Sequence, residues 1–205
     1  MSKQTKAKLL LTSILGLPIL GIVAAYLSYN TGIFKNIGRT NNGELILPPV
    51  DLQVLKLESL SSNDRPTTFD DQTWKLIVLA NDGCDKQCQQ QLYLTRQVHI
   101  ALGKEADRLE RIFISLNNTP LTHNKQQSEF NKVVNVIMKL HPKINIASTD
   151  KENIEQQLKN KVPELKNKIL LADPLGNIMM YYTQQHSGKE ILTDIKHLLK
   201  VSRVG

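Results

Sequence analysis

A long uncharged apolar run near the start of the sequence constrains the fold more than any other feature. Residues 9–29 have the sequence LLLTSILGLPILGIVAAYLSY, without a charged side chain. A helix needs about 20 apolar residues to cross the hydrocarbon core of a bilayer, and this run is long enough. Pro18 lies within it, which a membrane-spanning helix tolerates better than a helix in water. We therefore expect a single membrane-spanning helix at residues 9–29, and a water-soluble fold built from the residues that follow.

The residues around this run indicate its orientation. Several lysines lie within residues 1–8, and basic residues favour the cytoplasmic side of a span. We therefore expect a cytoplasmic N-terminus, with the chain from Asn30 onward on the opposite side. A cleaved signal peptide is the alternative, but its apolar core usually has about 7–15 residues before a small-residue cleavage site. Here the small pair Ala24-Ala25 is followed by a bulky tyrosine, so we favour an uncleaved anchor.

Charge and composition argue against one class of partner. The formal net charge is +7, but the 26 Lys and Arg residues are spread along the chain, and aromatic residues make up only 5% of it. A nucleic-acid interface would need a denser basic face interleaved with aromatic side chains. We therefore expect no nucleic-acid partner, and we expect solvated basic helix faces that are weakly attracted to anionic lipid.

The remaining chain is long enough for one ordinary domain. We expect residues 30–63 to form a linker with a possible edge strand, and residues 64–205 to form the domain. The linker contains the turn signal Asn41-Asn42-Gly43 and the stiff pair Pro48-Pro49. The possible edge strand would contain Leu52, Val54 and Leu57.

Short apolar runs alternate with amphipathic segments along the domain. The runs predict strands at 74–80, 111–116, 144–147, 169–172 and 178–182, and the amphipathic segments predict helices at 85–102, 128–140, 150–158 and 188–201. Strands that alternate with helices imply a parallel sheet, and the late hairpin adds antiparallel pairing. We therefore predict an α/β chain with a thioredoxin-like fold, in which helices flank a central mixed sheet, after one transmembrane helix.

The two cysteines of the sequence, Cys84 and Cys88, directly follow the first core strand and open its helix. A helix N-terminus carries unpaired amides and a partial positive charge, which stabilises a thiolate and increases its reactivity. Residues four apart lie on the same helix face, so the two sulfur atoms can form a disulfide or converge on one soft metal ion such as Cu(I). We favour redox or metal chemistry at this pair.

Two other interpretations of the pair are open. An oxidising compartment could produce a passive disulfide, although so short a loop constrains the unfolded chain little. The cysteines could also be free and buried as small apolar side chains.

The arrangement strand, Cys-x-x-x-Cys, helix, on a chain with one N-terminal anchor, resembles the Sco-type cytochrome c oxidase assembly proteins. The Asp-Pro-x-Gly hairpin of that family matches residues 173–177. Residues 42–49, 175–182 and 198–200 look similar to small transmembrane proteins found alongside oxidase assembly factors in gammaproteobacteria. The resemblance implies a membrane-tethered thioredoxin-like domain in the periplasm, held at the inner membrane. It also implies copper handling, with an oxidase subunit or its assembly factors as partner.

Sco-type proteins bind copper through both cysteines and one histidine that lies shortly before the hairpin. The matching stretch here, residues 162–171, contains no histidine, and Asp85 stands where that family commonly has proline. His123 follows the second predicted strand and should emerge at the same end of the sheet as the cysteines, so it is our candidate third ligand. We expect His99 to lie too far along the helix, His141 to complement a helix dipole, and His186 and His197 to be surface residues.

Three functions follow from the residues and the resemblance. In the first, the protein carries out thiol-disulfide exchange on copper-site dithiols of the oxidase, with Cys84 attacking and Cys88 resolving the mixed disulfide. In the second, it is a Cu(I) chaperone with Cys84, Cys88 and His123 as ligands. In the third, it is an assembly scaffold whose disulfide is structural.

Overall fold

The computed structural model describes residues 3–31, 40–60, 72–81, 83–117, 124–166 and 168–202. The chain divides into two compact units, Met1–Thr40 and Asn41–Gly205. The first unit contains helix α1 (Lys3–Thr31), with Pro18 inside it. Its segment Thr12–Thr31 is long and apolar enough to cross a membrane, and none of this segment is buried within the protein. A candidate membrane helix therefore lies where the apolar run predicts it.

The second unit is built on one mixed seven-stranded sheet with the strand order β1-β7-β6-β3-β4-β5-β2. Strands β3, β4 and β5 are parallel, and the remaining pairings are antiparallel. The strands are β1 (Glu44–Asp51), β2 (Glu58–Ser59), β3 (Trp74–Asn81), β4 (Leu109–Asn117), β5 (Ile144–Asp150), β6 (Ile169–Ala172) and β7 (Asn177–Tyr182).

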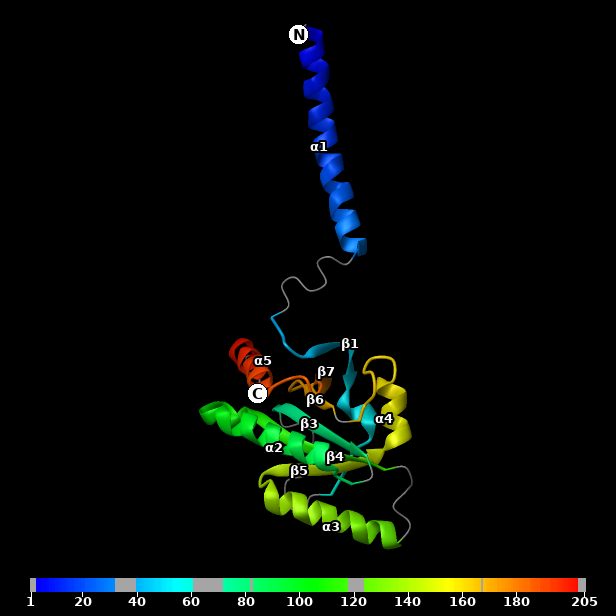
Figure 1. Ribbon diagram of the computed structural model, residues 1–205, viewed down its shortest axis with the longest axis vertical. Helices are drawn as coiled ribbons and strands as arrows, with labels where there is room; N and C mark the ends of the chain where they lie inside the picture. Colours follow the sequence, from blue (N-terminus) through cyan, green and yellow to red (C-terminus); the bar gives the residue numbers. More distant parts are fainter. Residues whose placement is uncertain are drawn as a thin grey trace. The chain divides into compact units, whose positions relative to one another are not determined.

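Helices cover both faces of this sheet (Figure 1). Core residues of α2 (Lys86–Ala101), α3 (Asn124–Leu140) and α5 (Gly188–Val201) pack on one face. Those of α4 (Lys151–Leu158) and the 3-10 helix η1 (Leu52–Leu55) pack on the other. A second 3-10 helix, η2 (Gly103–Arg108), joins α2 to β4. The connections through α2 and α3 step across the sheet in the same direction, and right-handed crossovers place both helices on the same face.

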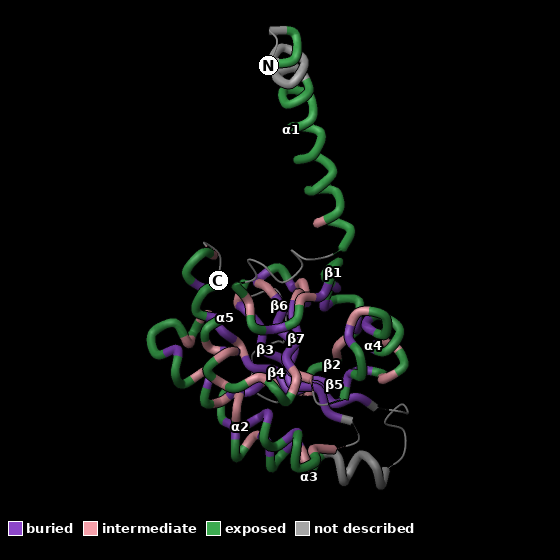
Figure 2. The backbone as a smooth tube through the Cα atoms, turned by 45° about the horizontal axis from the view of Figure 1, so that its top comes forward, coloured by how far each residue is buried: buried purple, intermediate pink, exposed green. Residues whose placement is uncertain are grey.

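The central strands are buried on both sides, as Figure 2 shows. Along β3, Leu76 and Val78 belong to the core under α2, whereas Ile77 and Leu79 belong to the core under α4. Such a strand has no polar face, so its sequence is a continuous apolar run rather than an alternating one. This explains why the run could be recognised in the sequence.

The predicted edge strand is a 3-10 helix flanked by two edge strands. We expected a strand through Leu52, Val54 and Leu57, but residues Leu52–Leu55 form η1, and along the chain the edge strand β1 precedes this helix and the short edge strand β2 follows it. The Asp51 carboxylate accepts a hydrogen bond from Gln53 N at 2.8 Å and caps this turn. Leu52 and Leu55, three residues apart, share one face of a 3-10 helix and are both buried.

Asp194 of α5 connects the residues just before β1 to Tyr182, the last residue of β7. Its buried carboxylate accepts hydrogen bonds from Asn42 N at 2.9 Å, Gly43 N at 2.8 Å and the Tyr182 hydroxyl at 3.3 Å. At Gly43, a Cβ atom would lie only 2.5 Å from Tyr182 Cε1 and 2.6 Å from Met180 Sδ. Glycine is therefore required for this close approach, which orders the chain from Asn41 onward into the second unit.

Candidate functional site

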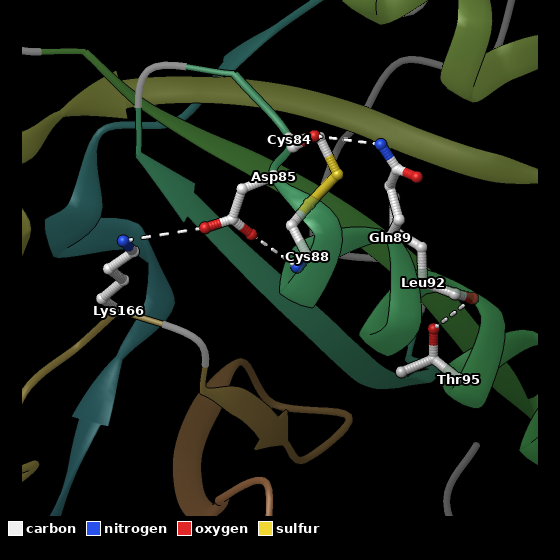
Figure 3. The surroundings of a disulfide bond; sticks show 7 residues. All are labelled: Cys84, Asp85, Cys88, Gln89, Leu92, Thr95 and Lys166. Atoms are coloured by element: carbon white, nitrogen blue, oxygen red, sulfur yellow. Dashed lines mark hydrogen bonds and ion pairs between the residues drawn. A yellow bond between two sulfur atoms is a disulfide. The ribbon is translucent and has the colours of Figure 1, made fainter.

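Cys84 and Cys88 form a disulfide at the junction between β3 and α2 (Figure 3). Their Cα atoms are 5.2 Å apart. Cys84 precedes the helix, and Cys88 lies in its first turn. The pair therefore occupies the strand-to-helix position expected from the sequence. Its catalytic and metal-binding roles remain predictions.

Asp85, between the two cysteines, fixes the geometry of this turn. It is the N-cap of α2, and its carboxylate accepts a hydrogen bond from Cys88 N at 2.8 Å. The same carboxylate lies 3.6 Å from Lys166 Nζ, and Gln89 Nε2 donates to the Cys84 carbonyl at 3.3 Å. The backbone on both sides of the disulfide is therefore held by side chains of the turn itself.

The two sulfur-bearing residues differ in exposure. Cys88 is 1% exposed and belongs to the core under α2, whereas Cys84 is half-buried at its edge. A partner molecule would therefore reach Cys84 first. This asymmetry is the one that an attacking and a resolving cysteine require.

A pocket of about 660 Å³ adjoins the first half of α2. It is lined on one side by helix residues that include Lys86, Gln90 and Tyr93, and on the other by residues such as Thr183 and His186 that follow β7. Its wall is rich in glutamine and carries little charge. Because Lys86 and Gln87 line it, the pocket adjoins the turn that contains the disulfide.

The histidines fall into separate parts of the fold. His186, expected at the surface, is held by its neighbours: its ring Nδ1 accepts from Thr183 N at 3.0 Å, and its Nε2 lies 3.0 Å from the Asn42 carbonyl oxygen. Its ring also packs edge-on against Tyr182, with centroids 5.6 Å apart. His197 is exposed, as predicted.

Among the residues that the structure describes, no three-ligand metal site is brought together. Within the part of the chain that it describes, no group of three or more His, Cys, Asp or Glu side chains could hold a metal ion. His123, our candidate third ligand, lies outside the described residues, so its role remains a prediction. His99 is on α2, but beyond the first turn that contains Cys88, as expected.

The capping role of Asp85 went unrecognised in the sequence, although a signal for it was present. Aspartate is a common N-cap residue just before a predicted helix. Its carboxylate can accept a hydrogen bond from the backbone N–H three residues later, which here is that of Cys88. The ion pair with Lys166 had no such signal, because that residue comes from a distant loop.

Comparison with known proteins supports the fold. A family model described as transmembrane-like, thioredoxin-like, C-terminal domain matches residues 74–202. No curated protein matches the sequence. Yeast Sco1 with copper bound is similar over 80% of this chain and 96% of its own, with 16% identity and a TM-score of 0.53. A second structure of yeast Sco1 is similar over 77% and 96%, with 16% identity and a TM-score of 0.52.

A copper-bound ScoI from Bradyrhizobium japonicum has 20% identity over 76% of this chain and 98% of its own, with a TM-score of 0.48. At 16% identity the yeast structures are evidence for the fold alone. Together with the family model, they confirm the thioredoxin-like fold that was predicted from the order of strands and helices. The family model covers most of the chain and names both its domain and its membrane-like character. With its N-terminal apolar helix and Sco-like fold, the chain belongs to the family of transmembrane-like, thioredoxin-like proteins.

Proposed function

We propose that this protein is a membrane-anchored thiol-disulfide exchange protein that reduces a copper-site cysteine pair during cytochrome c oxidase assembly. The observation that carries the proposal is the Cys84–Cys88 pair at the N-terminus of α2, with one cysteine half-exposed and the other buried. A purely structural disulfide explains the pair less well, because a disulfide that closes so short a loop constrains the unfolded chain little and therefore adds little stability.

The exchange step balances without a metal. The Cys84 thiolate attacks the disulfide of the client, and one client sulfur leaves as a thiolate. The Cys88 thiolate then attacks Cys84 in the mixed disulfide, which releases the client as a dithiol and forms the Cys84–Cys88 disulfide. Two electrons pass to the client, and the protons of the two thiols end on its sulfur atoms. A separate dithiol donor must then reduce this protein for another cycle.

The membrane anchor supports a partner in the same bilayer. Lys3, Lys6 and Lys8 precede the apolar run, which favours a cytoplasmic N-terminus and a periplasmic domain at the inner membrane. Outside the cytoplasm a disulfide persists, so a dithiol donor and a client disulfide can both exist there. Client copper sites at the membrane surface would lie within reach of a tethered domain.

A Cu(I) chaperone is the second candidate. The yeast Sco1 structure that shares the fold was solved with copper bound, and two thiolates are soft ligands suited to Cu(I). In this chain Cys84 and Cys88 would supply both thiolates, and His123 would supply a third donor. Copper would then be cargo that is handed to the oxidase.

Trapping of mixed disulfides tests the exchange mechanism. In the full chain, purified in maltoside detergent, Cys88→Ser should accumulate a mixed disulfide with an oxidised client through Cys84, because the resolving thiol is missing. Cys84→Ser is the matched control and should trap at least about tenfold less, because Cys88 is buried. Equal trapping by the two variants, or none by Cys88→Ser, would contradict the proposal.

Titration of the reduced full chain with Cu(I) distinguishes the chaperone. Stoichiometric binding that is lost in the Cys84→Ser/Cys88→Ser double variant and weakened in His123→Ala would support it. His197→Ala, an exposed histidine of α5, is the matched control. If the double cysteine variant supports oxidase assembly fully in cells, both the exchange and the copper function are wrong and the disulfide is structural.

A further inference from the structure

Unpaired buried donors gather at the end of the sheet opposite the disulfide. Arg111 of β4 is 3% exposed, and its Nε and Nη2 have no hydrogen-bond acceptor. His141, just after α3, is 8% exposed, and its Nδ1 has no partner either. Burying a charged or polar group without a partner is unfavourable, because water no longer solvates it. The two guanidinium atoms of Arg111 therefore mark a place where an acceptor is missing, and His141 Nδ1, which donates or accepts according to its tautomer, lies unpaired nearby.

The strand register places Arg111 beneath α2 and α3. It lies beside Leu76 of β3 and Ile144 of β5, near the amino ends of these three parallel strands. Leu109 and Phe113, two residues away on either side, belong to the core covered by α2 and α3. Side chains two apart on a strand share a face, so the Arg111 side chain is directed between these helices.

Further basic groups surround this position. Arg96 of α2 donates through Nη1 to the Leu140 carbonyl at 2.9 Å, which brings it to the end of α3 beside His141. His99 of α2 has hydrogen bonds to the backbone of Ala106 and of Leu109, which lies two residues before Arg111.

Carboxylates do not neutralise this cluster within the described residues. Burial and Arg96 lower the pKa of Arg111 to about 10, and no acidic group raises it. The guanidinium therefore still carries its charge at neutral pH. The neighbouring Glu110 belongs to the opposite face of the sheet, where it meets Lys75 at 4.0 Å and hydrogen-bonds Asn145. The cluster thus contains a buried positive charge with unpaired N–H donors, and no carboxylate of the described residues neutralises it.

We propose that Arg111, Arg96, His99 and His141 form a binding site for a small oxyanion of the phosphate class between α2 and α3. Guanidinium groups bind such oxygens through paired N–H donors. Donors that come from a strand, a helix and a helix end suit a tetrahedral anion, which presents oxygens in several directions. The site lies away from the disulfide and is independent of thiol chemistry.

Proton uptake should accompany binding. Burial first, and then Arg111, lower the pKa of both His99 and His141, and Lys143 and Arg96 contribute to one or the other. An anion placed among these groups would favour their protonated forms. Because both pKa values lie below the ordinary histidine value of about 6.5, binding should tighten as pH falls through and below about 6.5.

Titration of the full chain with inorganic phosphate tests this site. In maltoside detergent at constant ionic strength, phosphate should raise the melting temperature and change the fluorescence of Trp74, the single tryptophan, saturably. Trp74 is buried, belongs to the same core face and lies beside Leu109. Arg111→Met should weaken binding about tenfold or more. Arg111→Lys keeps the positive charge but removes the paired N–H donors of the guanidinium group, so it should weaken phosphate binding by an intermediate amount.

Lys104→Gln is the matched control, because it removes one exposed positive charge from η2 outside the cluster. It should bind phosphate as the wild type does. Three outcomes would overturn the proposal: no saturable binding, equal binding by Arg111→Met, or tighter binding of acetate than of phosphate.

Discussion

At the scale of single residues, substitutions can separate two roles of Asp85. Its carboxylate caps α2 and places a negative charge beside Cys84. Asp85→Asn keeps a good capping side chain but removes the charge. We expect the reduced Cys84 to be alkylated faster at mildly acidic pH in this variant, by severalfold, because a neighbouring negative charge disfavours its thiolate. The rate of iodoacetamide reaction against pH, in a Cys88→Ser background, measures this effect.

Asp85→Ala provides the comparison, because it removes both the charge and the cap. It should react as fast as Asp85→Asn but lose about 1 kcal/mol of stability. An unchanged alkylation rate in both variants would show that the charge of Asp85 does not reach the sulfur of Cys84.

Asp194 gives a second prediction at this scale. Asp194→Ala would leave the buried N–H of Gly43 and the partly buried N–H of Asn42 without their acceptor. We expect the free energy of unfolding to fall by about 2–4 kcal/mol, because several donors lose their partner together. Chemical denaturation followed by Trp74 fluorescence measures it. Asp107→Ala, at an exposed aspartate of η2, should stay within about 0.5 kcal/mol of the wild type, and an equal loss there would refute the role of Asp194.

The same residues show what the sequence could reveal. Cys84 and Cys88 were identified because their chemistry depends on local order: a strand, a short turn and a helix start. Asp194 and Arg111 were not, because their roles depend on partners brought together by folding. Asp194 looks like an ordinary polar position on an amphipathic helix, and Arg111 looks like the polar start of a strand.

At the scale of elements, local signals decided which predictions succeeded. The strand at 74–80 and the helix at 188–201 correspond closely to β3 and α5, because a continuous apolar run and a regular helical period are both visible in one chain segment. Strand β1 lacked such a signal. Its sequence contains Pro48-Pro49, and its pairing with β7 is irregular between Leu45 and Val50, so no alternation of apolar residues marks it.

The capping box of α5 yields a prediction at this scale. Ser187 accepts from Glu190 N at 3.3 Å, and the Glu190 carboxylate accepts from Ser187 N at 2.7 Å. We expect Ser187→Ala to destabilise the fold by about 1 kcal/mol at pH 7 through loss of the Ser187 cap. The hydrogen bonds from Ser187 lower the pKa of Glu190 in the folded state. Their stabilisation is thus present above the ordinary glutamate pKa and is lost as pH falls through the folded value.

The difference between the unfolding midpoints of the wild type and Ser187→Ala should therefore narrow, without vanishing, as the solution is acidified below about pH 4.5, because only the hydrogen bond from the Ser187 hydroxyl to Glu190 depends on pH in this comparison. Thr193→Ala, at an exposed position of α5 with a single local hydrogen bond, is the control. A difference between wild type and Ser187→Ala that stays constant across this pH range would contradict the coupled cap.

At the scale of the whole molecule, the two units differ in how far their apolar side chains are exposed. The unit Asn41–Gly205 buries its apolar side chains in two layers, one on each face of the sheet, whereas the apolar side chains described in residues 12–31 of α1 are exposed. Exposed leucine and isoleucine over several helical turns are stable in lipid but not in water. This contrast supports the anchor more strongly than the length of the apolar run alone.

Labelling of the cysteines tests the proposed orientation of the molecule. If the basic N-terminus is cytoplasmic, Cys84 lies outside the inner membrane, and a membrane-impermeant maleimide should label it in intact spheroplasts after mild reduction. The Cys84→Ser/Cys88→Ser variant controls for other reactive groups, since the sequence has no further cysteine. Changing Lys3, Lys6 and Lys8 to glutamate should reduce labelling severalfold, because these charges set the orientation. Labelling that requires lysis in the wild type would place the domain in the cytoplasm, where a persistent disulfide is disfavoured, and would remove the compartment on which the exchange function depends.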